Sequence, residues 1–473
     1  MKRVLLFLFL LAGMAAAAGE IPLDRLTPAA RQFMLNRNQE ARLEGVAPLV
    51  DGRQAVVGYL FRFQPAGFLV TSAEASVAPV YAWSPDGNLD LAQPEARLWK
   101  AVVTRDLQVR TGESNNLSGR ERLRIEQQWR EFLAGARRSP LFEQWPPEGT
   151  TYTGGWLETN WTQSAPYNNM CPMDLNTGSR SVAGCPATAM AQMINYHREI
   201  HGTRFNDDDD YYHNYGSGNS YWIDNDYIAW GFPCFDTLNH WLDSLEVSWE
   251  YGLSNPLKAA LTFACGVAAR QVYSSSASGT FGLEQAVMAW QRFGFWESRL
   301  VYPDDTTLNT LIADNVKAAL PVQLGLLVSG GSGGHNVVVD GYNTDDFYHF
   351  NFGWGGSANG WYTLPPVSIP YNLTIIEGAV LDIKSGNFTG LVESPSFASA
   401  TVCPNPFTDR ITVRGISGPS LIILYDPEGR EVMQTKVYDE KTEIRIGNLH
   451  PGCYLYRVTQ ENGSVSAGKV IKR

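Results

Sequence analysis

Apolar residues recur at helical spacing in the first third of the chain and predict three helices, over residues 29–43, 95–110 and 120–134. Ser118 and Glu121 have the spacing of a capping box before the third helix. Two apolar runs, 56–63 and 68–70, are separated by a turn sequence and predict a β-hairpin. Residues 19–145 are therefore expected to form an α+β domain.

The pattern changes twice further along the chain. Residues 146–384 combine helical stretches, such as 256–270, with strands that come late. A linker at 385–399 precedes a last segment, 400–473, in which nearly every apolar run is short and alternating, at 410–413, 421–425 and 453–458. This segment is predicted to be a small β-sandwich whose final hairpin turns at Asn462-Gly463.

The N-terminus has the pattern of a secretory signal peptide. Lys2 and Arg3 precede an apolar run at 4–11, and small residues follow at 16–19. The apolar run is too short to cross a membrane, and no other stretch approaches that length. We expect residues 1–18 to be removed and the remaining chain to be exported.

Charge and cysteine content narrow the possible functions. The formal net charge is −11, and loss of Lys2 and Arg3 makes it more negative, so the chain lacks the basic footprint of a nucleic-acid-binding protein. The six cysteines show no zinc-type pairs. Disulfides are possible in an exported protein, whereas Cys265, within a helical apolar pattern, is expected to be a buried hydrophobe.

Cys185 stands at the predicted start of a helix. Gly184 precedes it and Pro186 follows, and proline is favoured in the first helical turn. The N–H groups and the dipole at a helix N-terminus favour a thiolate over a thiol. Cys185 is therefore a candidate nucleophile.

His335 follows a glycine run and precedes the apolar run 337–339. An imidazole beside a thiolate accepts the thiol proton and later returns one to a leaving amine. The pair Cys185 and His335 thus predicts a cysteine protease.

Three other side chains complete a candidate site. The amide of Gln163 could bind an oxyanion beside the Cys185 N–H, the carboxamide of Asn351 could accept the imidazole N–H, and an indole such as Trp354 could shield the pair from water. Each residue also has an ordinary structural explanation when it is taken alone. It is the combination that favours catalysis.

Residues 146–384 resemble the streptopain family (C10) of bacterial cysteine peptidases, which have a papain-like two-lobed fold. The resemblance rests on four motifs in a fixed order, at 163–168, 184–192, 334–341 and 351–356. It implies Cys185 as nucleophile, His335 as general base and acid, Gln163 at the oxyanion hole and Asn351 as the residue that orients the imidazole. Phe352 departs from the family, which has tryptophan after this asparagine.

The same resemblance implies a substrate cleft lined by a serine- and glycine-rich loop. The loop matches residues 274–279, and the substrate-binding residues expected in the cleft are Ser276, Ala277, Ser278, Gly279, Gly334 and Trp354. No metal or organic cofactor is expected. The acidic run 207–210 is predicted to be a solvated loop rather than a calcium site, because its spacing is not that of an EF-hand.

The flanking regions also resemble known domains. Residues 19–145 are similar to the propeptide of the streptopain family through 59–63 and 67–72, which implies an inhibitory domain removed by cleavage between Arg137 and Trp156. Residues 400–473 are similar to the sorting domain of the type IX secretion pathway of Gram-negative bacteria. That similarity implies export through the periplasm to the cell surface or the medium.

The resulting prediction is a secreted cysteine endopeptidase that is made as a latent zymogen. Its expected partners are protein or peptide substrates, its own propeptide and the secretion machinery. The alternatives left open are a secreted adhesin or binding protein with a degenerate protease core, and acyl transfer to a nucleophile other than water.

Overall fold

The computed structural model describes residues 19–473 except 217, 304–306, 328–333, 366–374, 385–399, 417, 427–429, 440–441, 448 and 461–464. The predicted signal peptide, the predicted linker and the Asn462-Gly463 turn lie outside the described residues. The chain divides into two compact units, residues 1–385 and 386–473. No helix among the described residues is long and apolar enough to cross a membrane.

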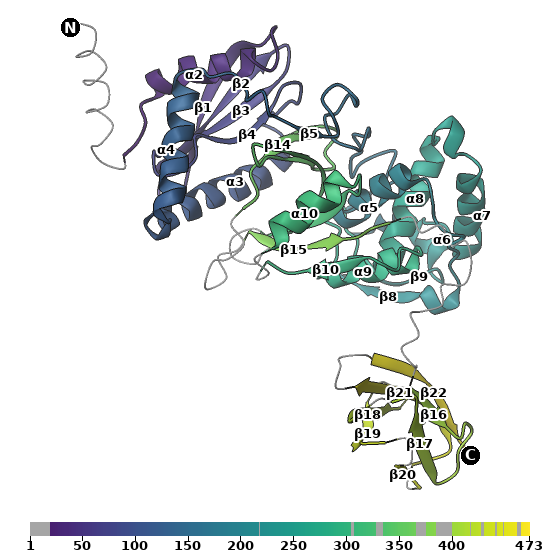
Figure 1. Cartoon of the computed structure of the whole chain (residues 1–473). Helices are drawn as coiled ribbons and strands as arrows, with labels where there is room; N and C mark the ends of the chain where they lie inside the picture. The colour runs from purple at the N-terminus through teal and green to yellow at the C-terminus, as the bar shows by residue number, and fades with distance from the viewer. Residues whose placement is uncertain are drawn as a thin grey trace, which may run out of the picture. The chain divides into compact units, whose positions relative to one another are not determined.

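The first part of the larger unit is a sheet covered by helices (Figure 1). Its helices are α2 (Leu23–Leu35), α3 (Pro94–Glu113) and α4 (Gly119–Leu133), and its strands are β1 (Arg42–Val50), β2 (Val56–Gln64), β3 (Phe68–Ser72) and β4 (Val80–Ser84). The hairpin β2–β3 and the capping box of Ser118 and Glu121 are confirmed.

The first predicted helix is partly wrong. We expected a helix over 29–43, but α2 ends at Leu35 and residues 42–50 form β1. Strand β1 pairs along its length with β2, from Arg42 opposite Gln64 to Val50 opposite Val56. Pairing with a neighbouring strand satisfies the backbone here, so tertiary contact overrides the local helical spacing.

The rest of the larger unit has two lobes, as in the papain-like fold that the sequence predicted. The helical lobe holds α5 (Cys185–His197), α6 (Tyr227–Trp230), α7 (Phe235–Glu246), α8 (Asn255–Ala268), α9 (Leu283–Arg292), the pair β6 (Met173–Asp174) and β7 (Ser179–Arg180), and the pair β8 (Tyr211–Asn214) and β9 (Ser220–Ile223). Buried apolar side chains of α5, α7, α8 and α9 form its core, and Cys265 is buried within it as expected.

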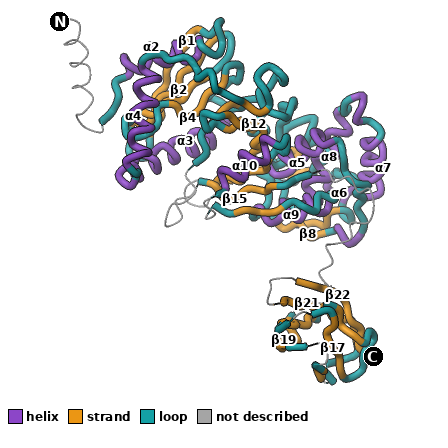
Figure 2. Tube along the Cα trace, in the orientation of Figure 1, coloured by secondary structure: helices purple, strands orange, loops and turns teal. Residues whose placement is uncertain are grey.

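The sheet lobe contains α10 (Leu308–Lys317), and its strands are β5 (Gln144–Trp145), β10 (Arg299–Val301), β11 (Val322–Leu327), β12 (Gly334–Asn343), β13 (Tyr348–Asn351), β14 (Gly360–Tyr362) and β15 (Ile376–Leu381). Figure 2 shows these strands alongside those of the N-terminal region. The order β1-β2-β3-β4-β14-β13-β12-β11-β15-β10 is one continuous sheet, joined where Trp83 of β4 pairs with Trp361 of β14. The N-terminal region therefore extends the sheet of the sheet lobe.

The smaller unit is all β. Its strands are β16 (Thr401–Cys403), β17 (Arg410–Arg414), β18 (Ser420–Tyr425), β19 (Glu431–Val437), β20 (Glu443–Arg445), β21 (Gly452–Gln460) and β22 (Val465–Lys472). They form one sheet of order β16-β17-β20 and another of order β19-β18-β21-β22. Apolar side chains of both sheets, including Ile411, Ile422 and Val458, share one core, which is the arrangement of a β-sandwich.

Candidate active site

Cys185 is the first residue of α5, as the sequence predicted. Gly184 caps the helix with φ +86°, and its carbonyl accepts hydrogen bonds from the N–H and the hydroxyl of Thr188, both at 3.0 Å or less. A Cβ on Gly184 would lie 2.6 Å from the amide of Gln271. Glycine is therefore required here both by the backbone conformation and by the space available.

Gln271 fixes the approach to the helix. Its amide is buried and donates to the carbonyl of Ala183 at 2.8 Å, and the N–H of Ala183 donates to the carbonyl of Gln163 at 2.8 Å. The backbone of Gln163 thus lies beside the residues that lead into Cys185. The Gln163 side chain is half-buried, and its role as an oxyanion donor stays a prediction.

His335 lies near the start of β12, opposite Leu326 of β11, and its ring is almost fully buried. Nε2 of the ring is 2.8 Å from the carbonyl oxygen of Phe352. The indole of Trp354 stacks on the ring with centroids 4.6 Å apart, in the position predicted for a water shield.

The elements that carry the two candidate catalytic residues, α5 and β12, pack against each other. The thiol of Cys185 lies within hydrogen-bonding reach of the backbone and the side chain of Asn336, the residue after His335. Burial raises the pKa of the Cys185 thiol to about 11, although the hydrogen bonds from Asn336 oppose the change. Burial also lowers the pKa of His335 to about 4, against the hydrogen bond to Phe352. In the full chain, thiol and imidazole are therefore both neutral near pH 7.

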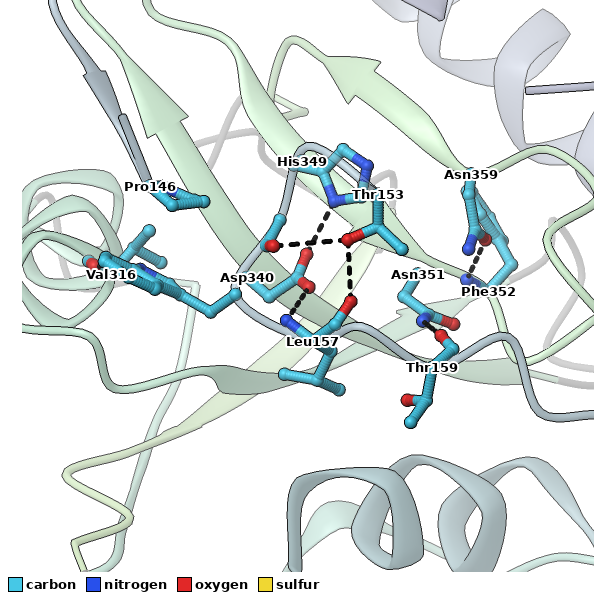
Figure 3. Close-up of polar contacts among 12 residues, drawn as sticks. Pro146, Thr153, Leu157, Thr159, Val316, Asp340, His349, Asn351, Phe352 and Asn359 are labelled. Carbon is cyan, nitrogen blue, oxygen red and sulfur yellow. Dashed lines mark hydrogen bonds and ion pairs between the residues drawn. The ribbon is translucent and has the colours of Figure 1, made fainter. Parts of the chain in front are cut away.

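Asn351 does not occupy the place predicted for it. Its amide donates to the carbonyl of Thr159 at 2.8 Å (Figure 3), and its Oδ1 accepts the N–H of Gly353 at 3.0 Å. Bonding to the N–H two residues ahead makes an Asx turn directly after β13. Among the described residues, the Phe352 carbonyl inside that turn accepts the hydrogen bond of the imidazole Nε2, so Asn351 shapes the turn and the backbone holds the ring.

Gln192 is a residue that the sequence analysis did not single out. It lies two turns after Cys185 on α5 and is fully buried. Its Oε1 accepts from the Thr159 hydroxyl at 2.9 Å and from the Trp161 N–H at 3.1 Å, and its amide lies 3.3 Å from Asn351. It therefore ties the helix of the nucleophile to the strand that ends at Asn351. A glutamine among the apolar residues of a buried helix face was the available signal.

The predicted substrate residues lie on both lobes. On the helical side, the loop 274–279 is closed by a bridge between Val272 and Gly279, and the N–H of Val182 donates to the Ser274 carbonyl at 3.1 Å. Ser276 and Ala277 are exposed at its tip, followed by the less exposed Ser278. On the sheet side, Gly334 precedes His335 on β12, and the indole of Trp354 stacks on the His335 ring. The loop is thus tethered three residues before the nucleophile.

The acidic run is a short 3₁₀ turn, and Asp209 within it pairs with Arg292 at 2.9 Å. Within the described ranges, no group of three or more histidine, cysteine, aspartate or glutamate side chains is placed to hold a metal ion.

Comparison with known proteins assigns the two recognisable parts of the chain. Residues 161–362 match the model of the peptidase C10 family, and residues 401–473 match that of the secretion system C-terminal sorting domain. The central domain is therefore similar to the C10 family of cysteine peptidases, and residues 401–473 are similar to the sorting domain of exported proteins. The family resemblance and the export to the cell surface or beyond that the sequence predicted are confirmed.

Individual relatives and solved structures are similar to parts of the chain. The thiol protease/hemagglutinin PrtT of Porphyromonas gingivalis is 24% identical over 77% of this chain and 41% of its own length. Streptopain of Streptococcus pyogenes is 26% identical over 43% of this chain and 53% of its own length. A prointerpain A fragment of Prevotella intermedia covers 73% of this chain and 99% of its own, with 19% identity and a TM-score of 0.48. The chain spans about half the length of these curated relatives or less.

Proposed function

We propose that this protein is a secreted cysteine endopeptidase made as a latent precursor. The Cys185 thiolate attacks the carbonyl carbon of a peptide bond, and His335 accepts the thiol proton and returns it to the leaving amine. The Gln163 amide and the Cys185 N–H stabilise the oxyanion. Water then attacks the acyl-enzyme with His335 as base, and the thiol is regenerated.

One observation carries this proposal. The cysteine at the start of α5 and the histidine of β12 come from opposite lobes, and the thiol reaches Asn336, the neighbour of that histidine. A free cysteine that is merely structural has no need of a glycine cap with positive φ, an amide brace behind it and an indole over the facing imidazole. The same residues fall within the part of the chain that matches the C10 peptidases.

The precursor state is proposed from the N-terminal region. Residues 19–145 would form the propeptide, 146–384 the catalytic domain and 400–473 the sorting domain, with a cut between Arg137 and Trp156. Strand β4 extends the catalytic sheet, which supports a tight intramolecular complex. The secretion machinery that reads the sorting domain is the proposed export partner.

The test is labelling of Cys185 by a thiol-reactive peptide analogue, before and after removal of residues 19–145. We expect labelling and casein hydrolysis only after removal, and loss of both in Cys185→Ala. Cys234→Ala is the matched control, because Cys234 is also a free, half-buried thiol but contacts only the Thr237 hydroxyl among its described side-chain partners. Casein hydrolysis by folded Cys185→Ala would contradict the mechanism, and an unreactive Cys185 in the processed protein would favour the adhesin alternative.

A further inference from the structure

A buried acid–base pair lies behind the candidate site. Asp340 is on β12, five residues after His335, and His349 is on β13, two residues before Asn351. The Nδ1 of His349 is 2.6 Å from Oδ1 of Asp340, and the two side chains are 3% and 0% exposed (Figure 3). Because a carboxylate only accepts hydrogen bonds, Nδ1 carries the proton. The chemistry proposed above does not use this pair.

The same carboxylate holds the chain that leads into the catalytic domain. Asp340 Oδ2 accepts the N–H of Leu157 at 2.9 Å, and the Asp340 carbonyl accepts the N–H of Trp156 at 2.8 Å. A Cβ on Gly155 would lie 2.3 Å from the carboxylate, so the backbone approaches as closely as glycine permits. The segment 153–161 is therefore anchored on strand β12 by one buried aspartate.

The anchored segment continues directly into the active site. Thr159 supports Asn351 and bonds to Gln192, and the N–H of Gly355 donates to the Trp161 carbonyl at 3.0 Å. Two residues later the chain reaches Gln163, the proposed oxyanion donor. A shift of residues 155–157 would thus be transmitted over a few residues to both sides of the site.

The far side of His349 faces the sheet. Its ring meets Trp361 of β14 edge-on at 5.4 Å, and Trp361 in turn stacks on Trp83 of the proposed propeptide at 5.8 Å. Loss of the propeptide would remove the contact between Trp83 and Trp361. The hydrogen bond between His349 and Asp340 lies within the catalytic domain and would remain in the processed enzyme.

We propose that Asp340 and His349 are a positioning pair, which locks segment 153–161 and so keeps Gln163 and the turn after Asn351 in register with Cys185 once the propeptide has left. The proposal rests on the proposed function. A buried carboxylate is costly unless it is fully hydrogen-bonded, and here the imidazole and the Leu157 N–H divide its two oxygens between them. Loss of either donor leaves one oxygen of the Asp340 carboxylate without a partner, so that the side chain and the segment bound to it can move.

Two substitutions of His349 separate positioning from packing. His349→Phe keeps ring volume but loses the donor, whereas His349→Asn leaves a gap but keeps an N–H near the position of Nδ1. For positioning, we expect kcat of the processed enzyme to fall about tenfold or more in His349→Phe, with KM little changed, because small misplacements of catalytic groups cost such factors. His349→Asn should retain more of kcat although it unfolds at a lower temperature. Asp340→Asn, which is isosteric, should resemble His349→Phe.

A second readout needs no activity. In the full chain carrying Cys185→Ala, amide exchange at Trp156 and Leu157 should quicken in His349→Phe and Asp340→Asn. His201→Phe is the control for loss of a histidine hydrogen bond, here to the Phe293 carbonyl in the helical lobe. Unchanged kcat in His349→Phe, or kcat that follows thermal stability across all variants, would overturn the proposal. A wild type that hydrolyses nothing would overturn the proposed function and the positioning role with it, while the exchange data would still report whether the pair anchors the segment.

Discussion

At the scale of single residues, the proposed chemistry needs a charged thiolate and imidazolium, whereas burial favours the neutral thiol and imidazole. Burial acts in opposite directions on the two proposed catalytic groups, raising the pKa of the Cys185 thiol and lowering that of the His335 imidazole. Transfer of the proton from sulfur to nitrogen would create a buried ion pair. Activation therefore has to provide water, substrate or a rearranged side chain that stabilises this pair.

Two histidines, the buried His335 and the half-buried His197, should make the folded chain sensitive to acid. Burial lowers the pKa of His335 and of His197 from 6.5 to about 4, with a smaller effect of His201 on His197. The unfolded chain binds these protons near pH 6.5 and the folded chain only near pH 4. The contribution of the two histidines to the free energy of unfolding is therefore complete above pH 6.5 and is lost as the pH falls through 4. For the buried His335 this contribution is about 3 kcal/mol.

The measurement is urea unfolding of the Cys185→Ala chain, followed by tryptophan fluorescence, from neutral pH down to about pH 4. His335→Gln should remove its own share of the acid sensitivity and leave that of His197. If the free energy of unfolding falls as steeply with pH in His335→Gln as in the chain that keeps His335, the imidazole of His335 is not buried and neutral.

The sequence identified some of these residues and missed others for a physical reason. Cys185, His335 and Gln163 could be predicted because their side chains suit catalysis and they lie next to glycine, proline or apolar runs. The turn after Asn351 and the Gln192 link depend on backbone direction and on partners distant in sequence, which spacing alone does not reveal. The bond between Asp340 and His349 arises only when β12 and β13 pair.

At the scale of elements, the start of α5 is the most constrained feature of the site. Predictions for helices with strong local signals were confirmed, as for α4 with its capping box. The first helix was misjudged because residues 42–50 gain more from pairing with β2 than from helical periodicity. For α5, the sequence showed the proline and the glycine at the start of the helix. The hydrogen bond that Gln271 donates to Ala183 could not be predicted, because Gln271 follows α8 and is distant in the sequence.

Gly184→Ala should damage the site more than an alanine at another left-handed glycine. The substitution imposes φ +86° on a residue with a Cβ and drives that atom to 2.6 Å from Gln271, so the amide must release the Ala183 carbonyl. We expect a loss of about 2–3 kcal/mol in stability and of more than about tenfold in kcat.

Gly178→Ala is the matched control. Its φ is +69°, but nothing lies within 4 Å of an added Cβ, so we expect only the conformational cost of about 1 kcal/mol and unchanged kcat. Thermal unfolding and peptide hydrolysis measure both variants. Equal effects of the two substitutions would show that crowding against Gln271 does not matter.

At the scale of the molecule, one sheet spans the proposed propeptide and the catalytic domain. The junction is made by backbone pairing of β4 with β14 and by the stacked indoles of Trp83 and Trp361. Trp99 adds a hydrogen bond to the Tyr362 hydroxyl at 2.9 Å, and Arg110 reaches the Leu364 carbonyl at 2.5 Å. The smaller unit folds around its own core, as expected for a sorting domain.

Trp83→Ala should weaken the hold of the propeptide. Trp83 is nearly buried against Phe33, Phe347 and Trp361, and truncation of such a side chain costs about 3–5 kcal/mol. Conversion of the full chain to the processed form should therefore be faster, as followed by gel electrophoresis over time. The processed enzyme should have unchanged kcat because it lacks residue 83, and an unaltered conversion rate would argue against this junction as the restraint.

The shared sheet also has a consequence for the fate of the processed enzyme. Departure of β4 turns β14 from an interior strand into an outer one, and the N–H and C=O groups that faced β4 lose their partners. Unpaired strand edges recruit extended chains, including copies of the same molecule. In the proposed maturation, removal of residues 19–145 is thus also the step at which the protein would gain a surface for self-association. The short length of β14, from Gly360 to Tyr362, limits the stability of such an adduct.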